Sequence, residues 1–63
     1  MPIVQISLIE GRDDAVKARV IKEVTDAIEH AADVPRSAIR VLINEIPASH
    51  WGVAGIPKSE KNK

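Results

Sequence analysis

The 63-residue sequence has no cysteine, a single aromatic residue (Trp51) and no net charge. Without cysteine there can be no disulfide framework and no thiolate metal site, and the expected compartment is the cytoplasm. Nine Lys and Arg balance nine Asp and Glu, which argues against a protein that binds nucleic acid or an anionic membrane, because such proteins carry a basic excess. No apolar run approaches the roughly 18 residues of a membrane span, and the start lacks the basic region of a signal peptide.

The short chain predicts one domain, residues 1–63. Hydrophobic residues make up 44% of it, mostly Ile, Val and Ala. A domain of this size buries only about 60% of its unfolded surface, so a monomer without staples would be marginal. We therefore expect subunits that share a core.

The local patterns predict a strand, a helix and a second strand. Residues 3–9 are mostly β-branched, and in residues 39–46 the apolar Ile39, Val41 and Ile43 share one face, so both segments are typical of strands. Residues 15–32 have the spacing of a helix that begins after Asp13 as N-cap and ends before Pro35. Its apolar stripe comprises Val16, Val20, Val24, Ile28 and Ala31. The other helix positions are mostly charged, and we expect a solvated face: Lys17, Lys22, Glu23, Asp26, Glu29 and His30.

These elements predict an α+β fold in which a crossover of about 29 residues joins two parallel strands by a right-handed connection. Residues 48–57 form either a loop or a short hairpin, and residues 58–63 form a polar, frayed tail. The helix can cover only one face of the strands. Because the other face also carries Ile, Leu and Val, we expect a second copy of the chain to cover it.

The usual catalytic and metal-binding patterns are missing. His30 and His50 are isolated, so no metal site is predicted, and Gly11 belongs to no phosphate-binding motif. Asp13 and Asp14 are better explained as helix capping than as a catalytic pair.

Pro2 is a candidate general base. A small second residue normally allows Met1 to be removed, which would leave a secondary amine at the N-terminus. A free α-amine has a pKa of roughly 7.7–8.0, and desolvation or a nearby cation lowers it further, toward the value a base needs at neutral pH. Taken alone, Pro2 is better explained as a common and inert Met-Pro start.

Two arginines stand in unusual places. Arg12 directly precedes a helix N-terminus, where a cation is unfavourable; a salt bridge to Glu10 or Asp14 is the simplest compensation, and an anionic ligand is the alternative. Arg40 lies in an apolar strand, where it would pair with Glu45 or a partner's acid. Its planar fork would also suit a substrate carboxylate or an enolate oxygen.

Several short segments carry a more specific signal when taken together. They are Met-Pro-Ile-Val-Gln-Ile at the start, Ile9-Glu10-Gly11-Arg12, Val34-Pro35, Ile39-Arg40-Val41, Asn44-Glu45 and His50-Trp51-Gly52-Val53-Ala54-Gly55. In this order and spacing, from Met1 to about Gly55, the chain resembles the 4-oxalocrotonate tautomerase family of the tautomerase superfamily.

The resemblance implies a β-α-β subunit with a short C-terminal hairpin, assembled as a homohexamer that is a trimer of dimers. It implies a cofactor-independent keto–enol shift, such as 2-hydroxymuconate to 2-oxo-3-hexenedioate in the catabolism of aromatics. By that likeness Pro2 is the catalytic base and Arg40 binds the 2-oxo end of the substrate, while Arg12 binds the distal carboxylate. The arginines would come from other subunits than the proline.

Other positions bear on specificity. Trp51 stands where the family commonly has phenylalanine, and with Ile9 it would line the pocket and keep the amine poorly solvated. Ala54 replaces a frequent glycine of the hairpin, and Ile9 replaces the second arginine of related dehalogenases, which disfavours hydrolytic dehalogenation. The alternatives are a paralogue that acts on phenylenolpyruvate-like enols and a non-catalytic module that only oligomerises.

Overall fold

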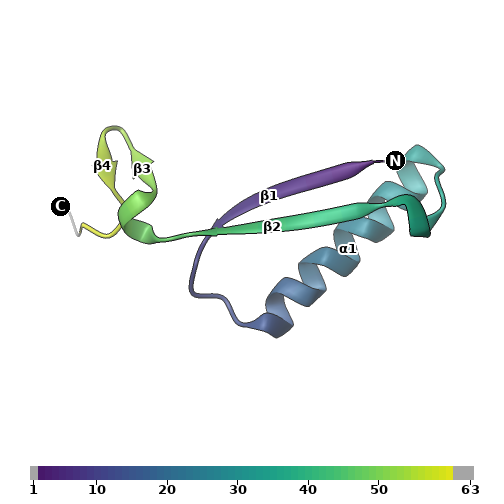
Figure 1. Ribbon diagram of the computed structural model, residues 1–63, viewed down its shortest axis with the longest axis horizontal. Helices are drawn as coiled ribbons and strands as arrows, with labels where there is room; N and C mark the ends of the chain where they lie inside the picture. The colour runs from purple at the N-terminus through teal and green to yellow at the C-terminus, as the bar shows by residue number, and fades with distance from the viewer. Residues whose placement is uncertain (1, 61–63) are drawn as a thin grey trace.

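The computed structural model describes residues 2–60 and confirms the β-α-β order. Strands β1 (Ile3–Ile9) and β2 (Arg40–Ile46) pair in parallel, with Ile3 opposite Arg40 and Ile9 opposite Ile46. Helix α1 (Asp14–Ala32) connects them across one face of the sheet (Figure 1). A 3₁₀ turn, η1 (Arg36–Ala38), comes before β2, which begins one residue later than predicted.

Local chemistry sets both ends of α1. The carboxylate of Asp13 accepts a hydrogen bond from the Val16 amide at 2.9 Å, which satisfies one of the unpaired donors of the first turn. At the other end Asp33 adopts a left-handed conformation, with φ 56° and ψ 50°. Pro35 then prevents the helix from continuing. The predicted cap and stop are therefore confirmed, with the helix starting at Asp14 rather than at residue 15.

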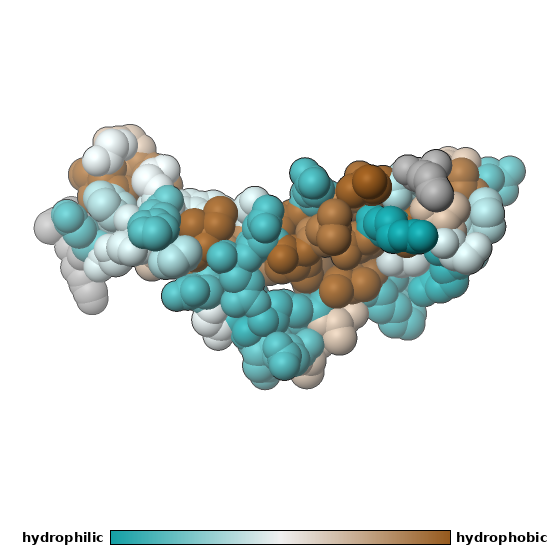
Figure 2. All heavy atoms as spheres, in the orientation of Figure 1, coloured by the Kyte–Doolittle hydropathy of each residue, from teal (hydrophilic) through white to brown (hydrophobic). Residues whose placement is uncertain are grey.

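The sheet has one covered face and one open face. Half-buried residues that alternate along the strands lie beneath α1, namely Val4, Ile6, Leu8, Val41 and Ile43. The opposite face exposes Ile3, Gln5, Ser7, Arg40, Leu42 and Asn44. Figure 2 shows apolar residues gathered along the strands and hydrophilic residues around the start of α1. This pattern agrees with the predicted helix that covers only one face.

The chain is elongated and thinly packed. Its radius of gyration is 14.9 Å and its extents are 45 × 24 × 14 Å, whereas a compact domain of this length has a radius near ~11 Å. Within residues 2–60, Ile39 is the one apolar side chain that counts as buried, with 8% of its surface exposed. A single chain therefore encloses almost no core of its own.

The C-terminal segment forms a hairpin rather than a loop. After a second 3₁₀ turn, η2 (Ala48–His50), β3 (Gly52–Val53) pairs antiparallel with β4 (Ile56–Pro57). The two residues between the strands both have positive φ, 54° at Ala54 and 86° at Gly55, as in a type I′ turn. The hairpin lies beyond the end of β2, away from α1 (Figure 1).

The predicted frayed tail is wrong for residues 58–60. The Lys58 amide donates to the Trp51 carbonyl oxygen at 2.8 Å, and the Ser59 amide donates to that of Ala48 at 3.2 Å. These bonds tie the segment back to the hairpin. Residues 61–63, and the predicted removal of Met1, lie outside the described residues.

No helix in the described part of the chain is both long and apolar enough to cross a membrane.

Candidate active site

Pro2 and Arg40 meet at one end of the sheet. The Arg40 amide donates a hydrogen bond to the Pro2 carbonyl oxygen at 3.0 Å, which extends the parallel ladder by one step. The Arg40 guanidinium lies on the open face and donates through Nη1 to the Ser37 carbonyl oxygen at 2.8 Å. Its remaining N–H groups can therefore face a ligand or another chain.

The predicted pairing of Arg40 with Glu45 is wrong. The two residues are separated by an odd number of positions along β2, so their side chains lie on opposite faces of the sheet. Glu45 lies on the face that α1 covers and binds Lys17 instead.

Arg12 lies at the opposite end of the sheet, in the turn between β1 and α1. Gly11, with φ 128°, allows the chain to reverse there. The Arg12 guanidinium is exposed and donates through Nη1 to the Ile9 carbonyl oxygen at 3.4 Å, a long bond. Neither predicted salt bridge, to Glu10 or to Asp14, is present among residues 2–60, and Asp14 pairs with Lys17 instead.

Ile9 and Trp51 also lie toward this second end. Ile9 is the last residue of β1, opposite Ile46, and is half-buried. Trp51 follows η2 and is half-buried, and its amide donates to the Ala48 carbonyl oxygen at 3.2 Å. The candidate apolar wall thus belongs to the same end as Arg12.

The structure therefore sorts the candidate residues into two groups. Pro2 and Arg40 lie at the start of the strands, whereas Ile9, Arg12 and Trp51 lie at or beyond their ends. β1 has seven residues at about 3.3 Å each, so roughly 20 Å separates the groups. Residues 2–60 enclose no pocket, and one chain does not bring the groups together.

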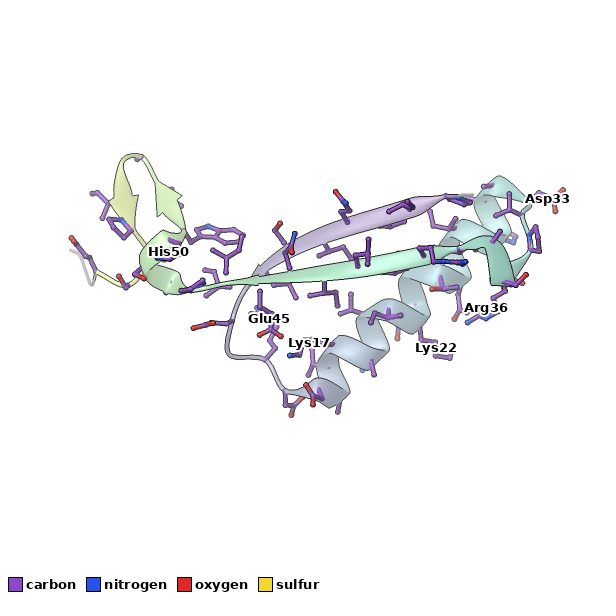
Figure 3. The ribbon with its side chains drawn as sticks, viewed as in Figure 1. Lys17, Lys22, Asp33, Arg36, Glu45 and His50 are labelled. Carbon is purple, nitrogen blue, oxygen red and sulfur yellow. The ribbon has the colours of Figure 1, made fainter. Side chains whose placement is uncertain are left out.

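An ion cluster connects α1 to β2 near the second end (Figure 3). The Lys17 ammonium bonds to the Glu45 carboxylate and lies 3.3 Å from an oxygen of Asp14. The bond to Glu45 raises the pKa of Lys17 and Asp14 adds to the effect, while desolvation opposes it. Lys17 was expected on the solvated face of the helix, but it is half-buried. Lys17 comes three residues before Val20 and seven residues before Val24, and this spacing places it on the side of the helix that faces the sheet.

A second cluster holds the far end of α1. Arg36 of η1 donates through Nη1 to Glu29 at 2.7 Å and lies 2.8 Å from a carboxylate oxygen of Asp26. Lys22 bonds to the other oxygen of Asp26, also at 2.8 Å. Bonds from Lys22 and then Arg36 lower the pKa of Asp26, and the two acids raise the pKa of Arg36.

The described residues contain no group of three His, Asp or Glu side chains placed to hold a metal ion.

Comparison with known proteins identifies the family. Residues 2–61 match the family model described as tautomerase enzyme, and the chain belongs to this tautomerase family. A probable tautomerase from Ralstonia nicotianae is 51% identical over 59 residues, which cover 94% of this chain and 84% of the relative. The predicted family is thereby confirmed.

Two further relatives match the chain over nearly all of both lengths. The 2-hydroxymuconate tautomerase of Pseudomonas putida is 41% identical over 63 residues, which cover 100% of each chain. The solved heterohexamer 4-oxalocrotonate tautomerase of Chloroflexus aurantiacus superposes with a TM-score of 0.94 at 35% identity, covering 98% of this chain and 100% of that one.

Proposed function

We propose that the protein is a cofactor-independent tautomerase that interconverts the enol and keto forms of a 2-hydroxydienoate, such as 2-hydroxymuconate and 2-oxo-3-hexenedioate. The observation that carries this proposal is the 41% identity, over the full length of both chains, to a 2-hydroxymuconate tautomerase. Membership of the tautomerase family supports the reaction class. The substrate class would place the protein in the catabolism of aromatic compounds, in the cytoplasm.

Pro2 would act as the general base. After removal of Met1 its nitrogen is a secondary amine with a free electron pair. The amine accepts the proton that the enol loses and returns a proton to a carbon of the same molecule. Atoms and charge balance without any cofactor or metal ion.

The two arginines would bind the two ends of a diacid. A guanidinium offers a planar pair of donors that matches a carboxylate. Arg40 would bind the 2-oxo end and stabilise the negative charge that develops on the oxygen. Arg12 would hold the distal carboxylate, and Ile9 and Trp51 would exclude water so that the pKa of the Pro2 amine stays low.

This site requires more than one chain. Pro2 and Arg12 lie at opposite ends of the sheet, and the open face with its exposed Ile3 and Leu42 needs a cover. A homohexamer built as a trimer of dimers would meet both needs. The Chloroflexus aurantiacus relative, described as a heterohexamer, supports an assembly of this kind.

The test is the ketonisation of 2-hydroxymuconate, followed by ultraviolet absorbance, with protein whose intact mass shows that Met1 is absent. We expect Pro2→Ala, which offers a primary amine, to lower kcat by about 10²-fold or more. Arg12→Ala should mainly raise KM, and Arg40→Ala should mainly lower kcat. Unchanged kcat/KM in all three variants would contradict the mechanism. Absent turnover by an intact assembly would favour the non-catalytic module.

A further inference from the structure

Lys17 occupies an unusual position for a lysine on a charged helix. Its side chain is 22% exposed and its Glu45 partner 34%, whereas the neighbouring pair Arg19 and Glu23 on the same helix is 79% and 60% exposed. The Lys17 pair also differs in what it joins. It links the first turn of α1 to the end of β2, while the Arg19 pair stays within one helix.

The turn that carries Arg12 is held at both ends by residues next to this ion pair. On the strand side, the Glu10 amide donates to the Ile46 carbonyl oxygen at 2.9 Å, directly beside Glu45. On the helix side, the Lys17 amide donates to the Asp13 carbonyl oxygen at 3.2 Å. The ion pair therefore closes a ring around residues 10–13.

Arg12 itself has little to hold it. Its guanidinium is exposed and has only the long bond to the Ile9 carbonyl oxygen within the described residues. The preceding Gly11 adopts a positive φ of 128° and adds no side chain to the turn. The placement of Arg12 thus depends on how firmly α1 is held against β2.

We propose that Lys17 and Glu45 form a clamp that positions Arg12 for the distal carboxylate of a diacid substrate. This inference rests on the proposed function. Lys17 and Glu45 touch no substrate in it and act as positioning residues. When the clamp is released, the start of α1 moves away from β2 and the Arg12 fork no longer meets the carboxylate.

The test compares two substrates in Lys17→Met, which keeps the apolar stem and removes the charge. We expect KM for 2-hydroxymuconate to rise about tenfold, below the ~10²-fold that a misplacement of about 1 Å can cost, because Arg12 is displaced but still present. The kcat should stay near that of the parent protein. KM for phenylenolpyruvate, an enol with one carboxylate, should not change because Arg12 has nothing to bind.

Four further variants separate positioning from a general loss of stability. Lys17→Arg retains the charge and should restore KM for the diacid. Glu45→Gln should reproduce the effect of Lys17→Met, and the double variant should be no worse than either single one, because the two residues act as a unit. Arg19→Gln removes an ion pair from the same helix and should leave both KM values unchanged.

An unchanged KM for the diacid in Lys17→Met would overturn the clamp, as would an equal rise for both substrates. Amide hydrogen exchange supplies a readout that needs no turnover. The Glu10 and Val16 amides should exchange faster in Lys17→Met than in Arg19→Gln, and equal rates would also overturn the clamp. If the parent protein turns over neither substrate, the proposed function fails while the exchange rates still decide whether the clamp exists.

Discussion

Ala54 is in a conformation that suits glycine. With φ 54° it occupies the first position of the turn between β3 and β4, and Gly55 follows with φ 86°. For a residue with a Cβ atom the left-handed region costs about 1–2 kcal/mol, since the Cβ approaches the following carbonyl oxygen. The hairpin therefore carries local strain at its tip.

Replacing Ala54 by glycine should relieve that strain. Glycine also has more freedom in the unfolded chain, which removes about 0.4–1 kcal/mol of the gain, so we expect Ala54→Gly to raise the free energy of unfolding by about 0.5–1 kcal/mol. Urea unfolding measures this difference. Ala18→Gly, at an exposed position within α1, is the matched control and should lower stability by about 1 kcal/mol. If both variants changed the free energy of unfolding in the same direction, strain at Ala54 would be contradicted.

Individual contacts differed in how far the sequence predicted them. The Asp13 cap involves residues three apart and was predicted, because helix capping depends on local sequence. The partner of Arg40 was not predicted, because it depends on which face of the sheet the side chain joins, and the Arg12 contact depends on the path of the turn between β1 and α1. Glu45 is near Arg40 in the sequence but on the other side of the sheet. Only the packing of α1 shows that Lys17 reaches Glu45.

The junction between α1 and β2 relies on charged side chains. Arg36 belongs to the short η1 turn and binds two acids of α1, Asp26 and Glu29, while Lys22 reinforces Asp26. The ion pairs therefore connect the end of the helix to the start of the strand.

The Asp26 pairs predict a pH dependence of stability. Because its folded-state pKa lies below the ordinary value of 3.8, its contribution is complete above that pH and is lost as pH falls through the lower folded value. Asp26→Asn should thus melt at a lower temperature than the parent at pH 7, and the two should converge in strong acid. Thermal scans across pH measure this. Added salt should reduce the difference in melting temperature at pH 7, since the ion pairs are partly exposed. A difference that does not change with pH would show that the Asp26 ion pairs do not cause it.

The regular elements were largely predictable, and the C-terminal segment less so. The β-branched residues of a seven-residue strand and the apolar stripe of a five-turn helix are local patterns, so the sequence of each segment indicates its secondary structure. The local pattern of residues 48–57 left loop and hairpin open, because Ala-Gly lacks the Asn or Asp that usually marks a type I′ turn. The family resemblance predicted the hairpin, and the structure confirms it. The attachment of residues 58–60 was not predicted, because the backbone hydrogen bonds that hold this segment do not depend on the pattern of its side chains.

In the molecule as a whole, one face of the sheet has no cover, and it carries the apolar side chains of Ile3 and Leu42. Leu42 lies near the centre of the open face and is 50% exposed. If the chain stayed alone, a charge at this position would cost almost nothing. In an assembly that buries the face, an unpaired ammonium there would be strongly unfavourable.

Leu42→Lys therefore tests whether the open face is an interface. We expect the variant to lose its assembly, as native mass spectrometry or sedimentation would show, and to lose tautomerase activity with it. Ala18→Lys places the same side chain on the exposed side of α1 and should remain assembled. An assembly that is intact in Leu42→Lys would show that subunits associate through another surface.

The distance between the two ends of the sheet also has a consequence for how such a chain can evolve after gene duplication. In an assembly where Pro2 of one chain works with Arg12 of another, the two contributions to a site need not be encoded by the same gene. After a duplication, one copy can lose the proline and the other the arginine, and mixed assemblies still contain complete sites. Neither gene can then be lost, so a short chain whose functional groups lie far apart is well suited to become two chains that depend on each other.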